Sequence, residues 1–311
     1  MQLPPEIFTI VIDYLSLRDI SSLVLTNHEV NKWVGMNDVI REYHLAKGDN
    51  IARVACEHGY INLIMYLHRV GGMIPDNAVV WASRAGHLPI VEYLCTVGAN
   101  PNVEYNYAIL SASKHGHLDV VKYLHSVGAD PMTDNNYPIQ MASKKGHLDV
   151  VKYLYTIGSD PTADDNWAMQ MACEYGHLDV VKYLCLVGAD STDDNNAAII
   201  LASECGHLDV VKYLYSVGAD PTVGENCPIQ MASKNGHLDV VKYLYSVGAD
   251  PTVGDNWAIQ VASERGHLDV VKYLHSVGAD PTVYDNYAIR LARENGHLLV
   301  VEYLQSISVV L

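Results

Sequence analysis

A nine-residue string, Gly-His-Leu-Asp-Val-Val-Lys-Tyr-Leu, constrains the fold most strongly because it recurs along the chain without change. It begins at Gly116, Gly146, Gly176, Gly206, Gly236 and Gly266, with near copies at Gly86 and Gly296 and a degenerate copy at Gly59. The first interval is 27 residues and the other seven are 30 residues. Periods of roughly 20–50 residues are typical of solenoids, whose units bury apolar faces against their neighbours. The 311 residues therefore predict about nine stacked units over residues 46–311, in place of two globular domains.

Each unit reads as two short helices separated by a glycine. In the unit around Gly146, Asn136 is the expected N-cap, the first helix is expected over 137–145, and Gly146 ends it. The second helix is expected over 148–157, and its apolar residues cover well over half of the helical circumference. Such a helix is buried on several sides, so the predicted fold class is an all-α solenoid of helix-turn-helix units.

The unit resembles the ankyrin repeat. Residues 137–142 (Tyr-Pro-Ile-Gln-Met-Ala) and 227–232 (Cys-Pro-Ile-Gln-Met-Ala) match the family's Thr-Pro-Leu-His-x-Ala with substitutions, and Gly-Ala-Asp follows several of the second helices. The resemblance implies a solenoid that binds proteins through its first helices, which line the concave face in this family. Shortened repeats of this kind resemble those of large DNA viruses of amoebae.

The chain departs from the ankyrin pattern in two ways. Its period is 30 residues, against about 33 in the family, and the missing residues fall between Gly-Ala-Asp and the next helix. We therefore expect the family's hairpin to be shortened to a tight turn. The Thr and His of the family's first helix are also replaced, the His usually by Gln, so their hydrogen bonds must be made differently or be absent.

Repetition produces ladders of histidine and tyrosine. Eight histidines follow the repeat glycines: His87, His117, His147, His177, His207, His237, His267 and His297. One ligand per repeat is too widely spaced for a shared metal ion, and the resemblance implies that these side chains bond to loop backbone. The tyrosines at the Tyr-Leu positions are expected to pack between helices. Asp119 and Lys122, repeated down the chain, are expected to form an exposed i,i+3 pair.

Composition and motifs argue against several classes of function. There are 36 acidic and 20 basic residues, a net charge of −16, and no cluster of Lys or Arg, which disfavours nucleic acids and anionic membranes as partners. We find no Walker loop, dinucleotide fingerprint or nucleophile motif, and Cys205 near His207 lacks a third orienting group. The expectation is a non-catalytic, monomeric, cytoplasmic protein with no cofactor or metal. It is consistent with six scattered cysteines and with an N-terminus whose first basic residue is Arg18.

The first forty residues form a segment of different composition. It contains the chain's single phenylalanine, Phe8, and reads Leu-Pro-Pro-Glu, an apolar helix ending in Tyr-Leu, then Asp-Ile and Leu-Val-Leu. This segment resembles an F-box, a helical motif that docks on a Skp1-type adaptor of a cullin ubiquitin ligase. The resemblance implies docking through Leu3, Pro4, Ile7, Phe8, Val11, Leu15, Ile20 and Leu23. The alternative interpretation is that these helices cap the first repeat of the solenoid.

Variation among nearly identical repeats points to a binding stripe on the first helices. Three positions, at i, i+3 and i+7, change along the chain while most others do not. They read Tyr107/Leu110/Lys114, Tyr137/Gln140/Lys144, Trp167/Gln170/Glu174, Ala197/Ile200/Glu204, Cys227/Gln230/Lys234, Trp257/Gln260/Glu264 and Tyr287/Arg290/Glu294. Aromatic residues beside polar ones suit an interface core, so we expect Tyr107, Tyr137, Trp167, Trp257 and Tyr287 to anchor a protein client. The expected interface adds Gln140, Lys144, Gln170, Glu174, Gln260, Glu264 and Arg290.

Two alternatives remain open at this stage. The aromatic residues of the stripe also suit filling of gaps left by the shortened hairpins, with the variation being drift between duplicated repeats. The acidic residues of the turns suit either a basic client or solubility alone. At the C-terminus, Leu299 replaces the usual Asp and the chain ends Ser-Val-Val-Leu, so this end either folds back or offers an apolar patch. The sequence therefore predicts an adaptor that consists of an F-box-like segment and ankyrin-like repeats. The alternative is a binding scaffold without a ligase role.

Overall fold

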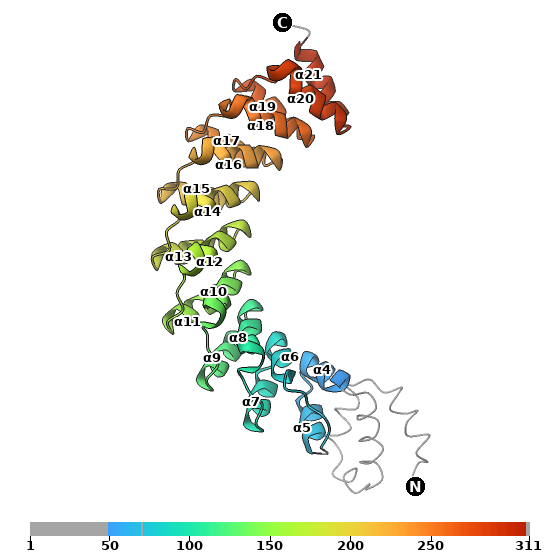
Figure 1. Ribbon diagram of the computed structural model, residues 1–311, viewed down its shortest axis with the longest axis vertical. Coiled ribbons are helices and arrows are strands. Elements are labelled where there is room, and N and C mark those ends of the chain that lie inside the picture. The colour runs from blue at the N-terminus through green and yellow to red at the C-terminus, as the bar shows by residue number, and fades with distance from the viewer. Residues whose placement is uncertain (1–48, 70, 309–311) are drawn as a thin grey trace, which may run out of the picture. The chain divides into compact units, whose positions relative to one another are not determined.

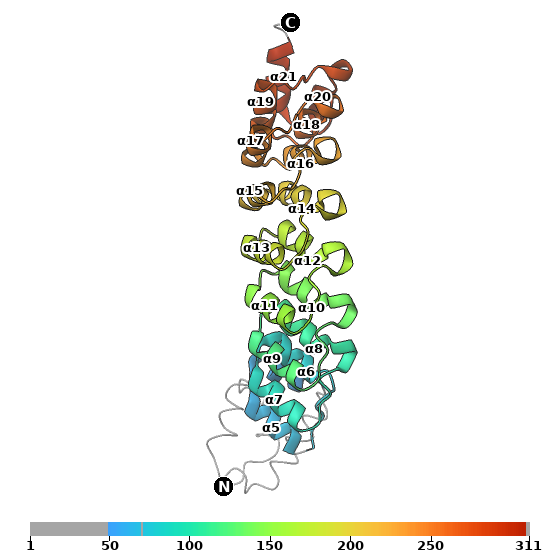
Figure 2. The same ribbon diagram turned by 90° about the vertical axis from the view of Figure 1, so that its left-hand side faces the viewer.

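The computed structural model describes residues 49–69 and 71–308, and within them every regular element is a helix (Figures 1 and 2). The helices form consecutive pairs, each with an even-numbered first helix and an odd-numbered second helix. Their bounds are α4 Asp49–His58, α5 Ile61–Arg69, α6 Ala78–Ala85, α7 Leu88–Thr96, α8 Val103–Lys114, α9 Leu118–Ser126, α10 Thr133–Lys144, α11 Leu148–Thr156, α12 Ala163–Glu174, α13 Leu178–Leu186, α14 Asp193–Glu204, α15 Leu208–Ser216, α16 Val223–Lys234, α17 Leu238–Ser246, α18 Val253–Glu264, α19 Leu268–Ser276, α20 Val283–Glu294 and α21 Leu298–Ser308. The all-α prediction is confirmed. The F-box-like segment and its eight expected docking residues lie outside the described residues.

The chain divides into two compact units, each built as two layers. Among the described residues, the first unit comprises those up to 142 together with 149–159, and the second comprises 143–148 and those from 160 onward. In the first unit, α4, α6 and α8 pack in series and α5, α7 and α9 form the second layer. In the second unit, the even-numbered helices α12 to α20 pack in series beside the odd-numbered helices α13 to α21 (Figure 2).

The core of each repeat comes from both of its helices. In the repeat of α16 and α17, Val240, Val241 and Leu244 of the second helix are completely buried, together with Ile229 and Ala232 of the first. Full burial of one such aliphatic side chain contributes about 1.5–3 kcal/mol. The prediction that the second helix is buried on several sides is confirmed. The repeated Val-Val-x-x-Leu is therefore the apolar content that each repeat contributes.

Successive repeats are joined by a histidine that lies on a glycine. Gly236 ends α16 with φ +79°, and a Cβ there would stand 2.5 Å from Nδ1 of His267 in the next repeat. Nε2 of His267 donates to the carbonyl oxygen of Lys234 at 3.0 Å, because a carbonyl can only accept. The same arrangement joins His177 to Gly146 and His207 to Gly176. The structural interpretation of the histidine ladder is confirmed.

A short left-handed turn precedes most of the first helices. Gly254, Asp255 and Asn256 have φ of +66°, +55° and +64°, so the right-handed part of α18 begins at Trp257. This left-handed conformation costs residues other than glycine roughly 1–2 kcal/mol of conformational free energy, and Asn and Asp tolerate it best. Oδ1 of Asn256 accepts a hydrogen bond from the backbone N–H of Asp280 in the next repeat at 2.8 Å.

Asn136 therefore does not have the N-cap role predicted for it. Its φ is +66°, whereas an N-cap residue has an extended backbone. In four other repeats the side chain of the equivalent asparagine accepts a hydrogen bond from the repeat that follows; these residues are Asn106, Asn196, Asn226 and Asn256. The asparagine side chain thus connects repeats and does not cap its own helix.

The tight turn expected in place of the hairpin is an aspartate turn. Oδ1 of Asp250 accepts from the backbone N–H of Thr252 at 2.8 Å and from its hydroxyl at 2.7 Å. Asp220 and Asp280 make the same pair of bonds to Thr222 and Thr282. These bonds hold the pKa of Asp280 below its ordinary value. The aspartate turn and the left-handed turn together bridge consecutive helix pairs without a strand in the described part of the chain.

The tyrosine ladder packs between consecutive second helices, as predicted. The ring of Tyr273 meets the ring of Tyr245 edge-on at 6.2 Å, and Nζ of Lys242 lies 5.6 Å from its centroid. The predicted pairing of Asp119 with Lys122 is wrong. Asp119 accepts from the N–H of Val120, and Lys122 lies over the ring of Tyr153 at 5.7 Å. A ring one repeat away offers the lysine a less mobile partner than an exposed carboxylate does.

Replacing Asn256 tests the left-handed turn. Asn256→Ala loses the bond to Asp280 and strains the backbone, so we expect the free energy of unfolding to fall by about 2–3 kcal/mol. Asn256→Gly loses only the bond and keeps the backbone conformation accessible, so we expect a smaller loss of about 1 kcal/mol. Urea titration followed by circular dichroism measures both. Equal losses in the two variants contradict a conformational role for this asparagine.

Candidate protein-interaction surface

The outermost row of the stripe is an exposed or half-exposed row of aromatic side chains. In the first unit, Tyr107 is 45% exposed and Tyr137 is half-buried. In the second unit, Trp257 is 36% and Tyr287 is 38% exposed, and Trp167 is half-buried. Each of these residues begins the right-handed part of its first helix, directly after the left-handed turn. The turn therefore places this position at the same point of the first-helix layer within each unit, and it is aromatic in these five repeats and Ala197 or Cys227 in two others.

The middle row of the stripe has a structural role. Gln140 and Gln260 are only 3% and 4% exposed. The Nε2 amide of Gln260 donates to the carbonyl oxygen of Asp255 inside the left-handed turn at 2.6 Å, and Gln140 makes the equivalent bond to Asn135 at 3.1 Å. The half-exposed Gln170 and Gln230 make the same bond, and the exposed Arg290 donates to the carbonyl oxygen of Tyr284 at 3.4 Å. The sequence left open whether the hydrogen bonds of the family's Thr and His are made differently or are absent; at the position of that histidine, the glutamine bonds to the left-handed turn.

In the third row, the backbone carbonyl and the side chain of a residue have different roles. The backbone carbonyls of Lys144 and Glu174 accept the histidine of the next repeat, while their side chains are half-exposed. Glu264 is half-exposed in the same way. Nζ of Lys144 lies 5.9 Å from the ring centroid of Trp167 and 4.9 Å from that of Tyr175. The side chains of this row are therefore free to differ from repeat to repeat without disturbing the stack.

A fourth variable row was missed by the sequence analysis. It is the residue directly before each repeat glycine, which follows the first helix and is exposed in seven consecutive repeats: His115, Lys145, Tyr175, Cys205, Asn235, Arg265 and Asn295. Variation alone marks this position, and it was overlooked because the predicted stripe took in only i, i+3 and i+7, whereas this residue is i+8. Nζ of Lys145 lies 5.8 Å from the ring centroid of Tyr175. The second unit thus carries a cluster of Lys144, Lys145, Trp167 and Tyr175.

The described residues also contain side chains of metal-ligating types and cysteine thiols. No three His, Cys, Asp or Glu side chains there are placed to hold a metal ion. Burial raises the pKa of the Cys56 thiol to about 12 and also raises that of Cys205, where Glu174 and Glu204 add to the effect. Thiols held in the protonated form are weak nucleophiles.

The comparison with protein families agrees with this geometry. The profile for ankyrin repeats in three copies matches residues 98–165, 140–225, 169–255 and 229–309, and the profile for a single ankyrin repeat matches residues 76–106. These matches cover well over half of the chain. The chain belongs to the ankyrin-repeat family. Ankyrin repeats are protein–protein interaction scaffolds, so the partners of this chain are proteins. A search of curated proteins finds no match.

Two further features of this ankyrin chain bear on its surface. None of the helices in the described residues is long and apolar enough to cross a membrane. At the last repeat, Leu298 and Leu299 of α21 are exposed, which corresponds to the apolar-patch alternative for this end; residues 309–311 lie outside the described part. Arg293 is exposed where earlier repeats bury a serine, such as Ser263.

Proposed function

We propose that this ankyrin-repeat protein is a non-catalytic adaptor that presents a client protein to a ubiquitin ligase. The F-box-like segment, residues 1–40, docks a Skp1-type subunit through Leu3, Pro4, Ile7, Phe8, Val11, Leu15, Ile20 and Leu23. The repeats, residues 46–311, bind the client. We propose the cytoplasm of a host cell as the place of this activity, because the short repeats resemble those of large DNA viruses of amoebae.

The observation that carries client binding is the exposed aromatic row. Tyr107, Trp257 and Tyr287 stay accessible at positions where a folded surface favours polar residues. Large rings beside charged groups, such as Trp167 beside Lys144, are typical of binding hot spots. Gln140 and Gln260 bond to the left-handed turn, so we leave these two residues out of the proposed contact surface. The surface consists of the aromatic row, the third row, and the fourth row, which contains Tyr175.

The alternative is a binding scaffold without a ligase role. It is favoured because the first forty residues directly precede the first repeats in the sequence, and the end of a solenoid needs a cap. In that case the chain masks or sequesters its client. The two functions share the client surface and differ only in what residues 1–40 contact.

Docking on a ligase subunit is tested with the full-length chain. The double substitution Phe8→Asp and Leu15→Asp introduces charge at two expected contact residues, so we expect co-purification with a Skp1-type subunit to fall at least tenfold. Asn27→Ala, beyond the expected contacts, is the matched control and retains binding. Circular dichroism confirms that the repeats stay folded. Absence of binding by the folded wild-type chain contradicts the adaptor role and leaves the scaffold.

Client binding is tested by comparing exposed aromatic residues on the two layers. Trp257→Ala removes a ring of the first-helix row, whereas Tyr215→Ala removes a ring of similar exposure from the second-helix layer. We expect Trp257→Ala to reduce capture of proteins enriched by the wild type at least fivefold and Tyr215→Ala to leave capture unchanged. Thermal unfolding is measured for both. Destabilisation by Trp257→Ala without loss of capture supports gap filling and contradicts the interface.

A further inference from the structure

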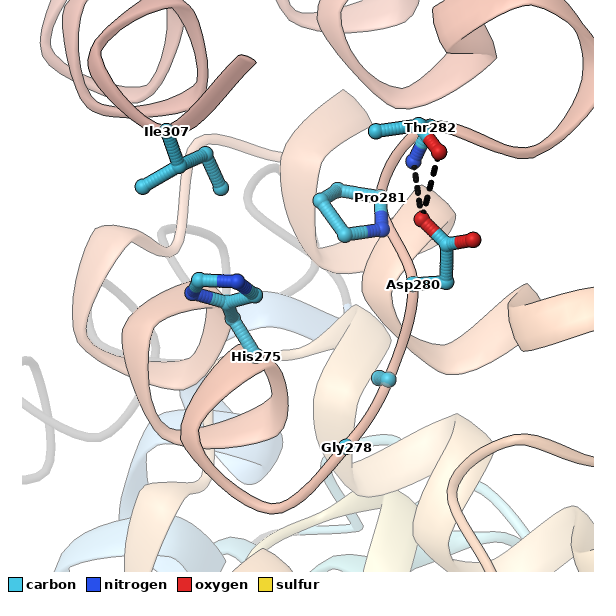
Figure 3. A pocket seen from close by; sticks show the side chains of 7 residues that line it. His275, Gly278, Asp280, Pro281, Thr282 and Ile307 are labelled. Atoms are coloured by element: carbon cyan, nitrogen blue, oxygen red, sulfur yellow. Dashed lines mark hydrogen bonds between the residues drawn. The ribbon is translucent and has the colours of Figure 1, made fainter. Parts of the chain in front are cut away.

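The second-helix layer of the second unit carries a cavity below the Gly-Ala-Asp turn at two equivalent places, three repeats apart. Cys185, Ala189, Ser191 and Val217 line the first place. Their counterparts 90 residues later are His275, Ala279, Pro281 and Ile307, which line the second (Figure 3). Because the repeats share one backbone pattern, differences between the two cavities come from their side chains.

In most repeats of this unit an aromatic ring occupies this place. Nδ1 of His275 lies 2.8 Å from the hydroxyl of Tyr303 in the next repeat, with ring centroids 6.0 Å apart. Tyr245 meets Tyr273 edge-on at 6.2 Å, and Tyr215 meets Tyr243 in the same way at 6.2 Å. The place between consecutive second helices is therefore shaped for a ring that contacts the ladder tyrosine.

Cys185 leaves that place without a ring. The cavity beside it measures about 540 Å³, against about 240 Å³ for the equivalent cavity at His275. The ladder tyrosine Tyr213 still forms one wall, and the smaller Ser191 stands where the later repeat has Pro281. The side chains that hold a ring elsewhere are thus present, and the ring itself is missing.

The neighbouring residue makes this place more apolar. Leu186 lines the cavity and is 81% exposed. The equivalent residues in the following repeats are Ser216, Ser246 and Ser276, whose hydroxyls each donate to the carbonyl oxygen three residues earlier at 2.6 Å. Leu186 has no hydroxyl to make that hydrogen bond, and it exposes apolar surface. The loss of a ring and the gain of an exposed leucine occur at adjacent positions of one repeat.

A lysine at the rim of the cavity favours an aromatic side chain. Nζ of Lys182 lies 5.6 Å from the ring centroid of Tyr213, at the edge of the cavity. An ammonium group attracts the negatively polarised face of a second aromatic ring. Asp190 also lines the cavity, and its Oδ1 accepts hydrogen bonds from the backbone N–H and the hydroxyl of Thr192. We propose that the cavity at Cys185 is a site for a tyrosine or phenylalanine side chain of a protein partner, in place of the chain's own ring. The site lies on the second helices and does not depend on the client surface proposed above.

The test uses the full-length chain and N-acetyltyrosinamide as the probe, followed by ligand-observed NMR. Cys185→Tyr restores the ring found in neighbouring repeats, so we expect the apparent affinity for the probe to fall at least tenfold. Cys185→Ser keeps the space and is the matched control, with affinity within twofold of the wild type. N-acetylleucinamide, which lacks a ring, is expected to bind at least fivefold more weakly than the tyrosine probe.

The outcomes divide cleanly. Equal binding of the tyrosine probe to the wild type and to Cys185→Tyr overturns the proposal, as does equal binding of the two probes to the wild type. If Cys185→Tyr does not fold, Cys185→His replaces it, because His125 and His275 occupy this position in other repeats. Loss of probe binding in both ring variants and its retention in Cys185→Ser support the site.

Discussion

The contact between a repeat histidine and the preceding repeat glycine is the interaction on which the rest of the structure depends. At Gly236 the positive φ ends the first helix, and the missing Cβ leaves room for the ring of His267. The hydrogen bond from that ring to the carbonyl of Lys234 then fixes the distance from one helix pair to the next. The connection between helix pairs consists of an aspartate turn and a left-handed turn, and this short connection corresponds to the 30-residue period.

The helices and their core were predictable from the residues, but the connections were not. The Val-Val-x-x-Leu pattern and the glycines predicted both helices of each pair, with the second helix ending near residue 157 as expected. Asn136 was misread because asparagine is common both at N-caps and in left-handed turns, and the local sequence does not separate the two. Lys122 was misread because its actual partner, Tyr153, lies one repeat away. Contacts between repeats are not visible in a helical wheel of one repeat.

The candidate surface was also only partly predictable, because variation marks both tolerated and recognised positions. The aromatic row and the charged row are accessible, as an interface requires. The middle row is glutamine in four of its seven repeats; Gln140 and Gln260 are buried, and their amides stabilise the turn that presents the aromatic ring. Helix patterns missed the residue before each glycine. The absence of a ring at Cys185 could be interpreted only from the structure, in which Tyr215, Tyr245 and His275 place a ring at the equivalent position of other repeats.

The central role of the histidine–glycine contact is tested most directly by a double-mutant cycle on Gly236 and His267, measured as free energies of unfolding in urea. Gly236→Ala is expected to cost more than Gly248→Ala, which has a positive φ but no atom within 4 Å of its Cβ. In a His267→Ala background, the cost of Gly236→Ala is expected to fall to that of Gly248→Ala, with a coupling of about 1 kcal/mol or more. Costs that add to within about 0.5 kcal/mol contradict the role assigned to this contact.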